Sequence, residues 1–188
     1  MRFFTSDTHA GHEKNLDYSA RDFPSIAAHD DALVSNWNAV VSTEDEVHHL
    51  GDVTFMSTED TKAWLARLNG TMLLTPGNHD FYRNKTRGTD VPLAKWYEPR
   101  VPVGSILTLD GGLEAELVHK PTHAKGHTGL VLCGRVHNAW KFYKHEGGRL
   151  WDSRVDVPPC LFVNVGIDHW GYAPVSEMDL VRAVLLHR

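Results

Sequence analysis

The sequence predicts a single α/β domain, residues 1–188, in which two facing β-sheets have helices on the outside. The length suits one domain of ordinary size. The hydrophobic share of 41% and the charged share of 23% are typical of soluble globular proteins. Short apolar runs alternate with helical patterns in the first half, which favours parallel strands, whereas the second half is richer in strands, which favours antiparallel or mixed pairing.

The first half is predicted to alternate strands with helices. Leu33 and Trp37 belong to an apolar stripe with helical spacing, which predicts the first long helix. Ser57 and Asp60 have the spacing of an acidic capping box, which marks the start of the second. We expect strands at residues 2–6, 46–50 and 71–75, helices at 25–41 and 57–68, and a polar loop at 84–90.

The second half is predicted to add the strands of the other sheet. The Asp-Gly-Gly sequence at residues 110–112 is a turn signal, so the two apolar runs beside it are expected to pair as a hairpin. We expect strands at residues 106–109, 114–118, 130–133 and 161–165, and a final helix at 176–186.

Composition excludes several classes of protein. No apolar run approaches the length needed to span a bilayer, and the N-terminus becomes polar by Thr5, too early for a signal peptide. Cys133 and Cys160 are too few for a disulfide framework or a four-sulfur zinc site. We therefore expect a cytoplasmic protein with reduced thiols and no membrane partner.

Charge is unevenly distributed along the chain. The net charge of −5 argues against general coating of DNA, which depends on neutralising phosphates. Residues 119–154, however, carry seven Lys or Arg against two Asp or Glu, a net +5, so the remainder carries −10. This segment either attracts a small anionic substrate or forms a solvated basic face, and charge alone leaves both interpretations open.

Histidine is abundant, at 13 of 188 residues, and several histidines lie in short polar motifs at the predicted carboxyl ends of strands. Carboxylate, imidazole and amide ligands without a thiolate suit a divalent ion such as Mn, Fe, Zn, Ni or Co. Asp52 is flanked by glycine and can approach two ions at once. We expect one or two divalent ions, most plausibly Mn²⁺, in a catalytic site. The motifs are Asp7-Thr8-His9, Gly51-Asp52, Gly77-Asn78-His79-Asp80, His119 and Gly134-Arg135-Val136-His137.

These motifs, in this order, resemble those of the calcineurin-like metallophosphoesterases. The extended sequences at residues 6–12, 50–53 and 164–168, the last followed by 172–176, are similar to those of small bacterial and phage members. The resemblance covers residue 3 to about residue 178. It implies an αββα sandwich of two mixed β-sheets flanked by helices, and a metal-dependent phosphoesterase.

The resemblance also assigns roles to individual residues. The carboxylate of Asp80 would orient the ring of the general acid His79 and favour its protonated form, because an alkoxide leaving group needs a proton. A metal-bound hydroxide would attack phosphorus. His12 would contact the phosphate at the rim. Asp7, His9 and His137 would hold the first metal, Asp52 would bridge, and Asn78 and His119 would hold the second.

Arg135 departs from the family pattern, which has a histidine at this position. A guanidinium stays protonated and cannot bind a cation. Arg135 either leaves the second metal with fewer protein ligands, or binds the substrate phosphate through its planar fork, and these two roles are compatible. In the third alternative, Arg135 faces solvent and His123 or His127 supplies the missing ligand.

Other residues have simpler interpretations. His48 and His49 lie inside a strand, so one is expected in the core and the other outside. The aromatic rings at residues 140–151, interleaved with lysines, could stack a nucleobase, although packing is favoured. Cys133 is expected to fill space as a small buried side chain.

The predicted activity is hydrolysis of small phosphodiesters, and the resemblance to small members of the family implies 2′,3′- or 3′,5′-cyclic nucleotides as substrates. A monoanionic diester demands less charge of the site than a dianionic monoester, and the chain has little room for a cap domain. The expected partner is a small phosphoester such as a nucleotide, with no strong sign of nucleic-acid binding and no prediction of oligomeric state. The alternatives are a phosphomonoesterase, a single-strand nuclease, and a non-catalytic scaffold with a degraded second metal site.

Overall fold

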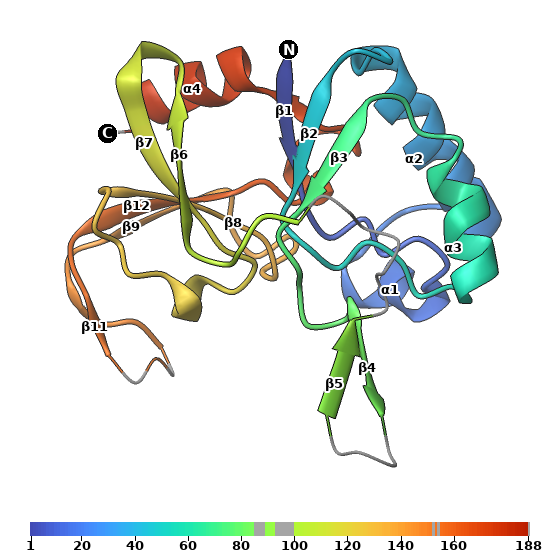
Figure 1. Ribbon diagram of the computed structural model, residues 1–188, viewed down its shortest axis with the longest axis horizontal. Coiled ribbons are helices and arrows are strands. Elements are labelled where there is room, and N and C mark those ends of the chain that lie inside the picture. Colours follow the sequence, from blue (N-terminus) through green and yellow to red (C-terminus); the bar gives the residue numbers. More distant parts are fainter. Residues whose placement is uncertain (85–88, 93–99, 152, 154, 188) are drawn as a thin grey trace.

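The computed structural model describes residues 1–84, 89–92, 100–151, 153 and 155–187, which form two mixed sheets packed face to face. In the first sheet the strand order is β13-β1-β2-β3, with β1, β2 and β3 parallel and β13 antiparallel to β1. Figure 1 shows helices α2 and α3 on the outer side of this sheet. The strands are β1 (Arg2–Thr5), β2 (Glu46–His49), β3 (Thr71–Leu74) and β13 (Val175–Ser176), and the helices are α1 (Glu13–Tyr18), α2 (Ile26–Val40) and α3 (Thr58–Leu65).

The second sheet has the order β6-β7-β8-β12-β9. Here β7, β8 and β12 are parallel, while β6 and β9 pair antiparallel at the two edges. The predicted hairpin is confirmed, because β6 and β7 pair across the turn that contains Gly111. The bounds are β6 (Ser105–Leu109), β7 (Leu113–Leu117), β8 (Leu130–Cys133), β9 (Phe142–His145) and β12 (Cys160–Asn164), with a short pair, β10 (Gly148–Arg149) and β11 (Asp156–Val157), beside them.

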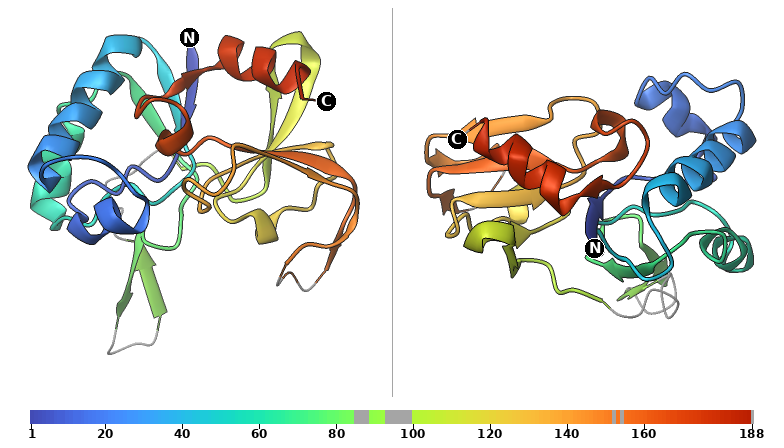
Figure 2. Two further views of the ribbon diagram at one scale, coloured as in Figure 1. Left: turned by 180° about the vertical axis from the view of Figure 1, so that it is seen from behind. Right: turned by 90° about the horizontal axis from the view of Figure 1, so that it is seen from above.

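Helix starts follow the capping residues in the sequence. The side chain of Ser57 accepts a hydrogen bond from the backbone N–H of Asp60 at 3.1 Å, as the capping box predicts. Ser25 caps α2 in the same way. The last helix, α4 (Glu177–Leu185), begins after Ser176 and lies across the end of the sandwich where the chain starts (Figure 2).

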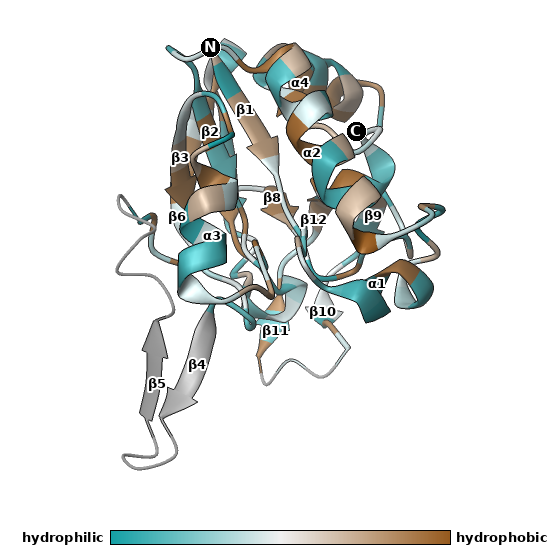
Figure 3. Cartoon of the chain, turned by 90° about the vertical axis from the view of Figure 1, so that its right-hand side faces the viewer, coloured by the Kyte–Doolittle hydropathy of each residue, from teal (hydrophilic) through white to brown (hydrophobic). Residues whose placement is uncertain are grey.

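Apolar side chains fill both faces of each sheet. On β1, Phe3 packs with Trp37 of α2, whereas Phe4 points into the core between the sheets together with Leu180 of α4. Figure 3 shows β1, β8 and β12 as mostly apolar strands, and α1 and α3 with hydrophilic surfaces. The outer face of the second sheet is covered by the chain around Leu150 and other nonhelical segments rather than by a long helix.

Burial on both faces corrects one prediction about the second strand. His48 and His49 are both buried, so neither faces solvent. The ring of His48 stacks on Phe4 with 5.3 Å between ring centroids. The two cysteines agree with expectation, since Cys133 and Cys160 are both free and buried.

Some elements were absent from the predicted series. Helix α1 was not predicted from the sequence. It spans 6 residues and begins after His12 without a side-chain cap, so it lacks the signals that identify longer helices. The predicted polar loop at 84–90 overlaps a hairpin, β4 (Phe81–Asn84) with β5 (Thr89–Pro92). Residues 84, 89 and 90 therefore lie in strands, and residues 85–88 lie outside the described part. Among the described residues, no helix combines the length and apolar character required to cross a bilayer.

Candidate metal centre

The candidate site lies where the parallel strands end. Strands β1, β2 and β3 run in the same direction, so the loops that follow them meet at one edge of the first sheet. The loops after β7 and β8 approach from the second sheet, and Figure 1 shows this end of the sandwich opposite α4. These loops carry Asp7 and His9, Asp52, Asn78 and His79, His119, and His137, respectively.

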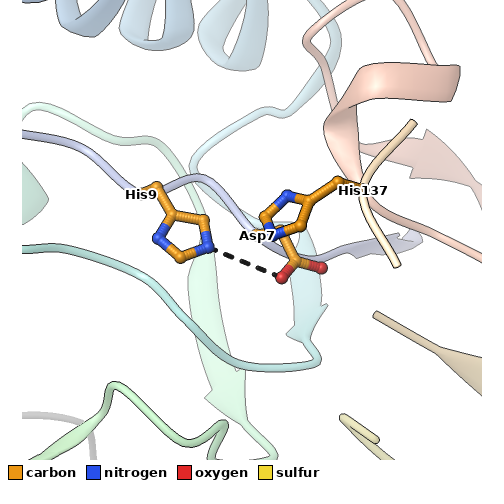
Figure 4. Close-up of side chains that lie close together, drawn as sticks. All are labelled: Asp7, His9 and His137. Carbon is orange, nitrogen blue, oxygen red and sulfur yellow. Dashed lines mark ion pairs between the residues drawn. The ribbon is translucent and has the colours of Figure 1, made fainter. Parts of the chain in front are cut away.

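Two groups of side chains meet there, with Asp7 in both. In each group the potential ligand atoms lie within 4.8 Å of one another, and the groups are Asp7, His9 and His137, and Asp7, Asp52 and His119. Figure 4 shows the imidazoles of His9 and His137 beside the carboxylate of Asp7. The Nε2 atom of His9 is 3.7 Å from both Asp7 Oδ1 and Asp52 Oδ2. Both carboxylates could therefore be shared between two ions, whereas the sequence assigned that role to Asp52 alone.

Buried polar atoms without hydrogen-bond partners point to a bound cation. Unpaired buried carboxylates and imidazoles are costly, so a fold retains them where an ion satisfies them. The donors are oxygen and nitrogen, a set that suits borderline or hard divalent ions. Within the described residues, the unpartnered atoms include Asp7 Oδ1, His9 Nε2, Asp52 Oδ2, Asn78 Oδ1 and His119 Nε2.

The other atom of each ligand is held by the protein. Asp7 Oδ2 accepts hydrogen bonds from the Ser6 hydroxyl at 2.7 Å and from the backbone N–H of Arg135 at 2.8 Å. Asp52 Oδ1 accepts one from the backbone N–H of His79 at 2.8 Å. His119 Nδ1 lies 2.7 Å from the carbonyl oxygen of Leu50, which fixes the tautomer with Nε2 free to bind a metal.

The backbone at the site is strained. Non-glycine residues seldom adopt a positive φ, and such strain concentrates at functional sites. The candidate ligands Asp7, His9, Asp52 and His137 have φ of 58°, 49°, 59° and 46°, and Arg135 has 75°. The surrounding packing must hold these residues in their unfavourable conformations.

A glycine allows the two sheets to approach at the centre. A Cβ atom on Gly134 would overlap the Ser6 side chain and the Asp7 carboxylate. This loop therefore tolerates only glycine at the position where the second sheet meets the ligands of the first.

A buried ion pair, which the sequence analysis missed, supports the ligand loops. Arg21 forms a two-pronged contact with Asp168, at 2.7 and 3.0 Å. The same guanidinium donates to the carbonyl oxygens of Asp7 at 2.7 Å and Thr8 at 3.0 Å. Asp168 Oδ2 is 3.7 Å from His137 Nδ1. The pair thus connects the strained loop after β1 with a ligand from the second sheet.

The structure corrects the prediction for Asp80. Its carboxylate accepts hydrogen bonds from the backbone N–H groups of Asp52, Val53 and Gly77, at 2.8, 3.0 and 2.7 Å. Both oxygens are thus used to join the loops after β2 and β3, and neither bonds to the ring of His79. The physical reason is that three amide donors converge on a carboxylate that is almost fully buried.

His79 and His12 both lie at the mouth of the centre, in contact with Phe55. The ring centroid of His79 is 5.7 Å from that of His9 and 4.6 Å from that of Phe55. His12 stacks on Phe55 at 3.8 Å. Burial and neighbouring positive charges lower the pKa of His12 to about 4, so this ring is neutral at pH 7 and can contact a phosphate only as a hydrogen-bond donor. The half-exposed Phe55 was not singled out in the sequence.

The titrating groups form a strongly coupled cluster. Burial alone would raise the pKa of Asp7, but the neighbouring imidazoles hold it well below its usual value. Burial alone would lower the pKa of His119, but the close Asp52 carboxylate, 3.2 Å from its Nε2, and the charge of Asp7 raise it to about 9. Without a metal, a proton on His119 therefore occupies the place of a cation.

Arg135 contributes to the site through its backbone, and its side chain is exposed. This exposure agrees with the first part of the third alternative, but His123 and His127, which were to supply the missing ligand, are exposed and belong to neither group of ligands among the described residues. The second group therefore has one imidazole, that of His119, where the family pattern predicts a further histidine.

Two mixed sheets and a carboxylate–imidazole centre at the carboxyl ends of their strands define the class of metal-dependent phosphoesterases. The chain belongs to the calcineurin-like phosphoesterase family, whose model matches residues 3–171.

Relatives with similar sequences cover nearly the whole chain. The Gene 66 protein of Mycobacterium phage L5 is 35% identical over an alignment of 193 positions, which covers 90% of this chain and 87% of the relative. An uncharacterised protein of Methanocaldococcus jannaschii is 26% identical over 183 residues, with 95% and 88% covered. The crystal structure of a protein of unknown function from Aquifex aeolicus matches with a TM-score of 0.64 at 23% identity, covering 97% of this chain and 98% of that one, and shows the same fold.

Proposed function

We propose that this phosphoesterase hydrolyses small phosphodiesters, including cyclic nucleotides. The observation that carries the proposal is the meeting of two candidate ligand groups that share Asp7, with the ring of His79 beside that of His9. Divalent ions held there would neutralise phosphoryl oxygens and lower the pKa of water. A dianionic monoester needs this neutralisation more than a monoanionic diester does, and the position of Arg135 leaves the second group short of an imidazole.

His79 is proposed as the general acid. Its backbone N–H is anchored on Asp52 Oδ1, so the ring is held beside the ligands without being one of them. Burial lowers the pKa of His79, while the charge of Asp52 opposes this shift. A protonated imidazole at this place can deliver a proton to the leaving oxygen, which the metal ligands cannot do.

Hydrolysis of two aryl phosphates by the purified protein tests the proposal. With Mn²⁺, bis(4-nitrophenyl) phosphate should be hydrolysed with a higher kcat/KM than 4-nitrophenyl phosphate, and a chelator should abolish both activities. Preference for the monoester would overturn the diesterase proposal. No hydrolysis of either would favour the scaffold alternative.

A pair of histidine variants tests the acid. His79→Ala should reduce kcat on the diester by about 10²- to 10⁴-fold while Mn²⁺ stoichiometry stays unchanged, because the ring contributes proton transfer and binds no metal. His127→Ala removes an exposed histidine outside the site and should leave both quantities unchanged. Unchanged turnover in His79→Ala would refute the assignment.

A further inference from the structure

A hollow of about 350 Å³ lies against the loops that carry His119 and His137. Its walls come from residues 120–122, from Arg135 and Val136, and from the indoles of Trp140 and Trp151. The volume is at the lower end of the range of about 300–1,000 Å³ for ligand pockets, which suits one ring system with its attached sugar rather than an extended chain.

The hollow and the metal centre are built from the same loops. Residues 120–122 directly follow His119, and Arg135 and Val136 directly precede His137. The backbone N–H of Arg135 donates to Asp7 Oδ2 at 2.8 Å, so this wall of the hollow is joined directly to a candidate metal ligand. A ligand with its phosphate at the metals could thus extend into the hollow.

At one wall of the hollow, an exposed tryptophan packs against two other aromatic rings. The side chain of Trp151 is 51% exposed, and its backbone has a φ of 44°, an unfavourable conformation for a bulky residue. Its ring is nearly parallel to that of Trp140, at 19° and 6.1 Å between centroids, and lies 5.2 Å from Tyr143. Both of these rings also pack against Phe162 in the core. The fold therefore fixes an indole at the surface, where a flat ligand can stack on it.

The charges of the hollow favour an anion. Lys120 and Arg135 supply two cations, and its described lining residues include no carboxylate. The basic segment at residues 119–154 provides the entire lining, in a chain whose net charge is −5. An aromatic anion could stack on the exposed indole and pair with the two cations.

We propose that this hollow is the subsite for the nucleobase of a nucleotide phosphodiester. The base would stack on Trp151, and the side of the nucleotide that carries the phosphate group would face Arg135 and Lys120. The proposal rests on the function proposed above and deepens it. The packing of Trp140 against Phe162 is compatible with it, because Trp151 is the more exposed of the two tryptophans.

Two cyclic phosphodiesters that differ in the base test the subsite. Adenosine 2′,3′-cyclic phosphate carries a base, whereas glycerol 1,2-cyclic phosphate has the same cyclic ester without one. Trp151→Ala should lower kcat/KM for the adenosine compound by about 5- to 100-fold, mainly through KM, because it removes a stacking partner. Its kcat/KM for the glycerol compound should stay within about twofold of the wild-type value. Trp151→Phe should restore most of the loss.

Tyr18→Ala is the matched control, since it removes another exposed aromatic ring on α1, outside the hollow. It should leave both substrates unaffected. Equal effects of Trp151→Ala on the two substrates, or no effect on either, would overturn the subsite while leaving the diesterase proposal intact.

If the wild-type protein cleaved neither ester, that result would instead count against the diesterase proposal. The subsite is then judged by calorimetric titration with adenosine 5′-monophosphate in the presence of Mn²⁺. Binding that weakens about 5- to 100-fold in Trp151→Ala supports it, and equal binding, or absence of binding to the wild type, overturns it.

Discussion

Arg135 stands where the family pattern predicts a histidine, and its side chain is exposed rather than directed among the ligands. The second group of ligands therefore depends on Asp7, Asp52 and His119, with the unpartnered Asn78 Oδ1 nearby in the same cluster of loops. A cation held by fewer protein ligands exchanges more readily with solvent. We therefore expect the purified protein to retain the second ion less fully than the first.

Arg135→His should raise the occupancy of the second ion. The left-handed backbone at this position tolerates histidine better than most residues, so the loop should keep its conformation. Elemental analysis after gel filtration should find more Mn²⁺ per chain in the variant, and titration calorimetry should find tighter binding of the second ion. Equal Mn²⁺ stoichiometry and affinity in the wild type and in Arg135→His would contradict this prediction.

The raised pKa of His119 predicts proton release on metal binding. With a pKa of about 9 in the metal-free protein, His119 is protonated at pH 7, and an ion that binds its Nε2 must displace that proton. Affinity for the second ion should therefore increase about tenfold per pH unit from pH 7 to 9 and then level off. Mn²⁺ titration in buffers of different ionisation enthalpy should show about one proton released at pH 7.

His119→Gln is the control for this release, because an amide neither binds nor loses a proton in this range. Proton release that persists in the variant would assign it to another group. A metal affinity independent of pH between 7 and 9 would contradict the prediction for the wild type.

The loop after β8 determines how closely the two sheets approach. Gly134→Ala would push a methyl group into the Ser6 side chain and the Asp7 carboxylate, both of which are buried and cannot retreat. We expect a loss of about 1–3 kcal/mol in the free energy of unfolding and Mn²⁺ binding weakened at least about tenfold. Urea denaturation and calorimetry measure the two effects.

Gly129→Ala separates crowding from backbone strain. Unlike Gly134, Gly129 has a positive φ, of 73°, and nothing lies within 4 Å of the added Cβ. This variant should lose about 1 kcal/mol of stability through backbone strain alone and keep wild-type Mn²⁺ affinity. Equal loss of metal affinity in the two variants would show that the contact at Gly134 is unimportant.

The elements that carry the ligands could be predicted because local patterns specify them. Each parallel strand is a short apolar run followed directly by a polar motif, so the convergence of Asp7 and Asp52 follows from parallel pairing in the first sheet. His119 follows β7 of the second sheet, so its approach depends in addition on how the two sheets face each other. The Arg21–Asp168 pair could not be found this way, since it joins residues 147 positions apart and neither has a distinctive local pattern. Asp80 was misassigned because adjacency in sequence to His79 does not determine where its carboxylate points.

The ligands come from both sheets, so a bound ion should strengthen the whole molecule. Asp7, His9 and Asp52 follow strands of the first sheet, whereas His119 and His137 follow strands of the second. Their arrangement exists only in the folded state. Free Mn²⁺ at about 100 times its dissociation constant should therefore add about 2.7 kcal/mol to the free energy of unfolding.

For a chain of 188 residues this corresponds to an increase in Tm of about 5–10 °C, reversed by a chelator and measurable by calorimetric scans. Asp7→Asn should lose most of this increase, because Asp7 belongs to both groups of ligands. Each scan should show one transition, since an ion held between two sheets is released only when they separate. The same Tm with Mn²⁺ and with chelator would mean that the two sheets hold no common ion.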